Sequence, residues 1–294
     1  MNRLILSVIL PAMVALYSFG AKPSDNLSMP DNSIVRTDSI NSSILQEWRH
    51  FTVYLPAGYH SDTTSCYPVL FLLHGFSDTN QSWFCNAPLA AIADQLTEAG
   101  EIRPMIIVSP NAGGKPGHDW NGYFNMPGWN YEDFFFNEFM PWFESVYRVC
   151  GNKESRAIAG LSMGGGGAAS YAQKHPELFG SAYIMSGWVH NEKNTDFIDN
   201  SDKVALVRQA VAENSCISYI ADADESTLEN LRSVKWYIDV GDDDFLLDAD
   251  IEFFRQMRSK NIACQLRVRD GSHNWLYWTS ALYTALPFIS RNFR

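Results

Sequence analysis

Gly160-Leu-Ser-Met-Gly164 matches the pattern G-x-S-x-G. The apolar run at 156–161 before it predicts a strand, and the residues at 165–175 after it predict a helix. In such a strand–turn–helix unit the serine sits on a sharp turn with its hydroxyl above the sheet. The motif alone also fits a glycine-rich helix start that serves only packing, but its context favours a nucleophile. A phosphate-binding loop is excluded because no G-K-[ST] follows.

The segments around this unit repeat the same alternation of strand and helix. Further apolar runs predict strands at 51–55, 67–74, 105–108, 181–185, 235–240 and 265–268. Apolar spacings of three and four predict helices at 89–96, 131–147, 249–259 and 277–289. This order predicts an α/β fold with a mostly parallel central sheet and helices on both faces.

A polar, acidic stretch at 189–231 interrupts the alternation. Two short helices are expected within it, near 204–211 and 226–231. We therefore expect a short insertion after the sixth strand.

The N-terminal residues are predicted to be separate from the folded domain. Residues 1–21 combine Arg3, an apolar run at 4–16 and small residues near the end, which indicates a signal peptide. A membrane anchor is disfavoured because the run is short and contains Pro11. Residues 22–45 are polar and predicted to form a flexible segment that leads into edge strands, and residues 46–294 are expected to form the catalytic domain. The predicted location is secreted or periplasmic.

Composition excludes several classes of partner. The 294 residues carry a net charge of −11, so nucleic acid would be repelled. The hydrophobic fraction of 46% is that of a globular protein, and no later segment is expected to enter a membrane. Five cysteines without zinc-like spacing predict no metal, and no disulfide pairing is assigned. The oligomeric state stays open.

A serine nucleophile needs a base, and the base needs an acid that orients it. In this kind of fold the chain order is serine, acid, histidine, each after a strand. His273 follows the strand at 265–268 and is the predicted base for Ser162. His118, in a glycine-rich loop, is its one serious rival but precedes Ser162.

The acid is sought in Gly241-Asp-Asp-Asp244, which follows the strand at 235–240. Most carboxylates in such a run are solvated. Asp244 is favoured, with Asp243 and Asp242 as alternatives.

An oxyanion hole requires two backbone N–H groups that face the developing negative charge. Met163, directly after the serine, supplies one. Phe76, in the loop His74-Gly-Phe76, is assigned the other, with Gly75 as the second choice. His74 is expected to support this loop rather than to react.

Several motifs together resemble a known family. They are R-H-F-T-V-Y-L-P-A-G-Y at 49–59, L-L-H-G-F at 72–76, Y-E-D-F-F-F-N-E-F-M-P-W-F-E at 131–144, G-L-S-M-G-G-G-G-A at 160–168, G-D-D-D-F-L at 241–246 and G-S-H-N-W at 271–275. The chain resembles the esterase D-like α/β-hydrolases of carbohydrate esterase family 1, which include feruloyl and acetyl xylan esterases. This resemblance implies an α/β-hydrolase fold, and the family pattern G-T-x-D-x-L points to Asp244. The chain departs from the pattern at Asp242, Ser272 and Asn274, where Thr, Gly and Asp are usual.

The function expected from the triad and the resemblance is a secreted serine carboxylesterase. Its substrates would be feruloyl or other hydroxycinnamoyl esters on plant cell-wall polysaccharide or its oligosaccharides, and it would need no cofactor. Alternatives are an acetyl xylan esterase, a sugar acyltransferase of the same fold and a catalytically inactive carbohydrate-binding homologue. Hydrolysis of S-formylglutathione is disfavoured by the signal peptide, because that chemistry is cytosolic.

Aromatic residues crowd the loops expected at the mouth of the site. They are Trp120, Tyr123, Phe124, Trp129, Trp188 and Trp275. Either several of them are buried beneath the insertion or two or three offer stacking surfaces to an aryl group or a sugar. Trp188, Trp275 and Trp129 are the predicted substrate-binding residues.

Overall fold

The computed structural model describes residues 32–113, 123–190 and 209–294 of the chain. The predicted signal peptide, the rival His118 and Trp120 lie outside these described residues. Within them, no helix has the length and apolar character needed to cross a membrane.

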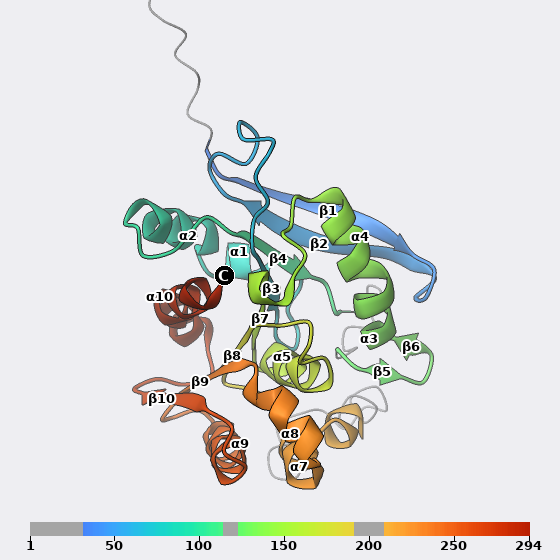
Figure 1. The fold of residues 1–294 in the computed structure, drawn as a ribbon, viewed down its shortest axis with the longest axis vertical. Helices are drawn as coiled ribbons and strands as arrows, with labels where there is room; N and C mark the ends of the chain where they lie inside the picture. The colour runs from blue at the N-terminus through green and yellow to red at the C-terminus, as the bar shows by residue number, and fades with distance from the viewer. Residues whose placement is uncertain (1–31, 114–122, 191–208) are drawn as a thin grey trace, which may run out of the picture.

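The centre of the molecule is a sheet of eight strands in the order β1-β2-β4-β3-β7-β8-β9-β10 (Figure 1). The strands are β1 (Ile34–Ser42), β2 (Glu47–Leu55), β3 (Val69–Leu73), β4 (Ile106–Pro110), β7 (Arg156–Leu161), β8 (Ser181–Met185), β9 (Lys235–Gly241) and β10 (Cys264–Arg269). Strands β1 and β2 run antiparallel to their neighbours, and all the other pairs are parallel. The prediction of a mostly parallel sheet is confirmed.

Helices cover both faces of the sheet, as predicted (Figure 1). One face carries α1 (Ser82–Cys85), α2 (Leu89–Glu98) and α10 (Trp275–Asn292). The other carries α3 (Tyr131–Phe134), the π-helical turn Phe135–Phe139, α4 (Met140–Val146), α5 (Met163–Lys174), α7 (Cys216–Asp222), α8 (Glu225–Arg232) and α9 (Leu247–Ser259). Each face buries its own apolar cluster, because the parallel strands are hydrophobic on both sides. A short hairpin of β5 (Asn125–Met126) and β6 (Trp129–Asn130) and a 3₁₀ turn at Lys153–Ser155 complete these elements.

The segment 22–45, predicted to be flexible and to lead into edge strands, contains a regular strand at residues 34–42. These residues form edge strand β1, which pairs with β2 along its whole length, from Ile34 with Leu55 to Ser42 with Glu47. Most of its side chains are exposed or half-buried, so its sequence is polar and lacks the apolar pattern of a core strand.

The insertion follows β8, which is the sixth strand of the large sheet in chain order. Helix α8 matches the helix expected near 226–231, whereas α7 was not predicted. Most of the other expected helix, near 204–211, lies outside the described residues.

Two of the five cysteines form a disulfide for which the sequence assigned no pairing. Cys66 is bonded to Cys150 across a sequence separation of 84 residues. The bond joins the segment before β3 to the segment after α4, where Tyr67 and Val149 also form a β-bridge. Cys85, Cys216 and Cys264 are free thiols.

Candidate active site

Ser162 lies on a strained turn between β7 and α5. Its backbone has φ 53° and ψ −119°, a region that non-glycine residues rarely adopt. Gly160 makes the turn possible, since a Cβ there would lie 2.2 Å from the carbonyl oxygen of Gly164. The tight turn lifts the Ser162 side chain out of the strand direction and presents it above the carboxyl edge of the sheet.

The structure brings Ser162, His273 and Asp244 together in one chain of hydrogen bonds. His273 Nε2 lies 2.9 Å from Ser162 Oγ, and His273 Nδ1 lies 2.9 and 3.0 Å from the two carboxylate oxygens of Asp244. The three residues follow β7, β10 and β9, which are parallel strands whose carboxyl ends meet at one edge. This geometry allows His273 to accept the serine proton while Asp244 orients the imidazole.

Asp244 differs from its two neighbours in burial and in partners. Asp242 and Asp243 are exposed, and an oxygen of Asp242 accepts the Gly271 N–H at 3.0 Å. Asp244 is buried, which raises its pKa, but hydrogen bonding and charge from His273 and the Leu246 N–H outweigh burial. The net effect is a pKa below the ordinary carboxyl value, so Asp244 is a carboxylate at neutral pH.

Two residues that the sequence reasoning missed support this carboxylate. The nearby Ser186 hydroxyl contributes to lowering the pKa of Asp244, and it accepts the indole N–H of Trp278 at 3.1 Å. Ser186 has φ 46° and directly follows β8. No motif marks either residue, because the contact joins β8 to α10 across 92 positions of sequence.

The loop after β3 lies against the turn at Ser162. A Cβ on Gly75 would come within 3.6 Å of the Ser162 Cβ and 2.5 Å of the Leu161 side chain. The Gly75 N–H donates to Asp78 at 3.2 Å. Met163 is the first residue of α5, so its N–H has no partner within the helix. The loop after β3 and the start of α5 thus both lie beside Ser162.

The predicted aromatic residues are mostly packed. Tyr123, Phe124 and Trp188 are buried in the core cluster that includes α5. Half-buried Trp275 contacts Trp83 and Trp278 with ring centroids 5.1 and 5.5 Å apart. Half-buried Trp129 stacks on Tyr131 and lies under the guanidinium of Arg49. Substrate binding by Trp275 and Trp129 stays a prediction.

Of the three candidate tryptophans, Trp188 directly contacts the turn at Ser162. Its backbone N–H donates to the Ser162 carbonyl at 2.9 Å, and its ring meets Phe76 edge-on at 6.4 Å. Its buried indole Nε1 has no hydrogen-bond partner among the described residues. Phe245, which the sequence reasoning missed, packs on His273 at 4.4 Å and is 41% exposed.

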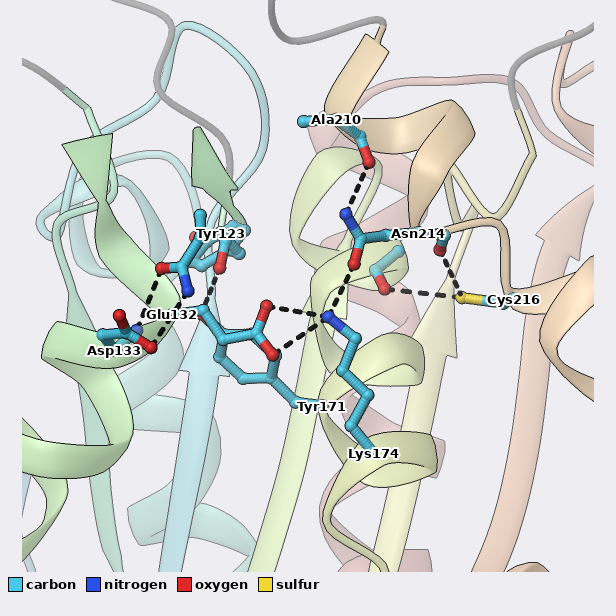
Figure 2. Close-up of polar contacts among 10 residues, drawn as sticks. Tyr123, Glu132, Asp133, Tyr171, Lys174, Ala210, Asn214 and Cys216 are labelled. Carbon is cyan, nitrogen blue, oxygen red and sulfur yellow. Dashed lines mark hydrogen bonds and ion pairs between the residues drawn. The ribbon is translucent and has the colours of Figure 1, made fainter. Parts of the chain in front are cut away.

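Helix α5, which begins beside Ser162, is fixed at its far end by a polar cluster (Figure 2). The ammonium of Lys174 bonds both oxygens of Glu132 at 2.8 and 2.9 Å and the side-chain oxygen of Asn214. The Tyr171 hydroxyl donates to the Tyr123 carbonyl. These contacts join α5 to α3 and to the insertion, so the helix has little freedom to shift under Ser162.

Asp250, on α9, is a buried carboxyl group with an incomplete set of partners. One oxygen accepts the Gly187 N–H at 2.9 Å, and the other has no partner in the part of the chain that the structure describes. Burial, followed by the nearby charge of Asp244, raises the pKa of Asp250 well above the ordinary value of 3.8. The folded protein therefore holds a proton on Asp250 where the unfolded chain has lost it.

Asp250→Asn is expected to stabilise the protein more at pH 8 than at pH 5. The contribution of the native carboxyl falls as pH rises above about 3.8, because unfolding then releases its proton. The neutral amide removes this loss. Urea midpoints at both pH values measure the difference, with Asp248→Asn, an exposed neighbour on α9, as the control. A stability difference that does not change with pH would contradict a protonated Asp250.

No group of His, Cys, Asp or Glu in the described ranges is arranged to hold a metal ion.

Comparisons with known proteins agree with this fold. The putative esterase family matches residues 42–289. A solved ferulic acid esterase is 49% identical, with a TM-score of 0.85 over 89% of this chain and 99% of its own. The chain therefore belongs to the putative esterase family, and its fold is the α/β-hydrolase fold of carboxylic ester hydrolases.

More distant relatives match only part of their length. An esterase of Mycobacterium tuberculosis is 40% identical over 46% of this chain and 28% of its own. An endo-1,4-beta-xylanase/feruloyl esterase of Xylanibacter ruminicola is 31% identical over 46% of this chain and 19% of its own. This chain thus matches less than a third of either relative.

Proposed function

We propose that the protein is a secreted serine carboxylesterase that hydrolyses feruloyl or related hydroxycinnamoyl esters of plant cell-wall polysaccharide or its oligosaccharides. The hydrogen-bonded chain Ser162–His273–Asp244 on the strained turn carries the proposal for the reaction. The 49% identity to a ferulic acid esterase, over 99% of that protein, supports the choice of feruloyl as the acyl group.

Ser162 Oγ attacks the ester carbonyl carbon while His273 Nε2 takes its proton. The carbonyl oxygen becomes negative, and the Phe76 and Met163 N–H groups stabilise it. His273 then returns the proton to the leaving alcohol, and the acyl group stays on Ser162. A water molecule gives its proton to His273, attacks the acyl-enzyme and releases the carboxylic acid and free Ser162. Asp244 keeps the imidazole in the tautomer that accepts at Nε2.

Trp188 is the residue that we assign to the acyl group. Its ring meets that of Phe76 edge-on, and its backbone N–H donates to the carbonyl of Ser162, the residue that would carry the acyl group. Its buried Nε1, without a partner in the described segments, is a donor that a phenol or methoxy oxygen would satisfy. An aryl group packed against the indole gains about 1 kcal/mol from the ring contact, which an acetyl group is too small to make.

The specificity test compares methyl ferulate with methyl acetate, which share a leaving group. We expect a higher kcat/KM for methyl ferulate, and Trp188→Ala should lower this preference by about 5- to 50-fold, the cost of one aromatic contact and one hydrogen bond. Trp48→Ala, which removes a tryptophan that is 62% exposed on β2, is the matched control and should leave the preference unchanged.

Strong release of acetate from acetylated xylan without release of ferulate would overturn the hydroxycinnamoyl assignment. It would favour an acetyl esterase instead. An acetyl esterase of Caldicellulosiruptor saccharolyticus, 24% identical over 76% of this chain and 83% of its own, is a relative with that activity in its name.

A further inference from the structure

We propose that Arg49, a buried residue outside the triad, is a positioning residue for the oxyanion hole and acts on it through His74. The inference rests on the proposed assignment of the Phe76 N–H to that hole. The contacts run from Arg49 on strand β2 through residues 111–113 to the loop after β3.

The side chain of Arg49 is held in one orientation and hydrogen-bonds the backbone of residues 111–113. Its side chain is 4% exposed and pairs with Glu47 at 2.6 Å. Its Nη2 donates to the carbonyl of Gly113 at 2.6 Å and to the carbonyl of Asn111. These two carbonyls flank Ala112, so the guanidinium fixes the turn on both sides of the Ala112 N–H. A planar guanidinium is suited to such two-point contact.

The fixed turn presents the Ala112 N–H to His74. This N–H donates to His74 Nε2 at 2.9 Å, so Nε2 is the unprotonated nitrogen. The proton is therefore on Nδ1, which donates to the Gly75 carbonyl at 2.8 Å. Burial lowers the pKa of His74 to about 4, and the charge of Arg49 adds to this effect, so the imidazole is neutral at pH 7.

The Gly75 carbonyl belongs to the same peptide unit as the Phe76 N–H. The described peptide bonds are trans, and in a trans peptide the C=O and N–H point in opposite directions. When His74 holds the carbonyl, the Phe76 N–H must point away from His74. Asp78 holds the preceding N–H of Gly75, so both peptide planes around Gly75 are fixed. Preorganised donors of this kind are what an oxyanion hole requires.

Arg148 offers a matched control. Like Arg49, it donates hydrogen bonds to backbone carbonyls, here those of Tyr59, Asp62 and Ser65. Its guanidinium lies 3.9 Å from the ring centroid of Tyr59, as that of Arg49 lies over Trp129. Its contacts lie at the amino end of β3, the edge of the sheet opposite Ser162. Loss of Arg148 therefore removes a comparable structural contact without touching the loop after β3.

The experiment measures 4-nitrophenyl acetate hydrolysis and inhibition by an aryl trifluoromethyl ketone. Attack of Ser162 on this ketone creates an oxyanion in the same hole. Arg49→Met is expected to lower kcat by about 10- to 100-fold, the cost of misplacing rather than deleting a catalytic group, with KM nearly unchanged. The inhibition constant should rise by a similar factor. Arg49→Lys keeps the positive charge but has a single donor nitrogen. Its kcat and inhibition constant should lie between those of Arg49→Met and the wild type.

A double-mutant cycle tests the route through His74. His74→Asn keeps a donor near the Gly75 carbonyl but removes the link to Ala112. If the link carries the effect of Arg49, adding Arg49→Met to His74→Asn should lower kcat by less than twofold more.

The proposal is overturned if Arg49→Met and Arg148→Met have the same kcat and the same inhibition constant. If Arg49→Met does not fold, Arg49→Lys decides in the same way: unchanged kcat and inhibition would overturn it. The acetate substrate keeps this test separate from the proposed acyl specificity. A wild type that cleaves 4-nitrophenyl acetate but not methyl ferulate would defeat the specificity assignment and leave the role of Arg49 measurable.

Discussion

Ser162→Ala is expected to lower kcat by about 10³- to 10⁶-fold, the range that loss of the nucleophile costs in serine hydrolases. The alanine has no oxygen to form the acyl-enzyme, while the fold around it is unchanged. His273→Ala should cost a similar factor, because the 2.9 Å hydrogen bond to Ser162 Oγ is the route for the proton. The double variant should be little worse than either single variant, since both remove the same step. Initial rates on methyl ferulate measure all three.

His118→Ala is the control for the choice of base. His118 precedes Ser162 in the chain and lies outside the described residues. His273, by contrast, is hydrogen-bonded to both Ser162 and Asp244. We expect His118→Ala to keep most of the wild-type kcat. Equal losses for His118→Ala and His273→Ala would count against the assignment of His273.

Asp244→Asn should lower kcat by about 10³- to 10⁴-fold. The amide places a donor beside Nδ1 and favours the wrong imidazole tautomer, as in other triads. Asp242→Asn and Asp243→Asn are matched controls on neighbouring, exposed carboxylates. Both should keep kcat within about tenfold, the Asp242 variant because its amide oxygen still accepts from the Gly271 N–H. Equal losses in the three variants would leave Asp244 without a special role.

The parts of the fold that depend on local pattern were predictable from the sequence. Apolar runs that are buried on both faces and helices with an apolar stripe have clear periods, and the structure contains them near the expected positions. Edge strand β1 has no such pattern, because one strand neighbour and a mostly exposed surface require few apolar side chains. Its pairing with β2 is a tertiary contact that composition does not reveal.

The residues of the candidate site that follow from motif and chain order were predictable from the sequence. The residues placed by long-range contacts were not. The turn at Ser162 and the histidine after the last strand follow from motif and order. The hydrogen bond of Trp278 to Ser186 and those of Arg49 to the carbonyls of Asn111 and Gly113 join segments distant in sequence. No spacing rule places an arginine on β2 against a turn after β4.

Intact-protein mass spectrometry of the enzyme, acid-quenched during turnover of methyl ferulate, tests whether Ser162 forms an acyl-enzyme. We expect a mass increase of one feruloyl group, located by peptide mapping on Ser162 and missing from the Ser162→Ala variant. Turnover of methyl ferulate without any adduct on Ser162, or with the adduct on another residue, would contradict this expectation.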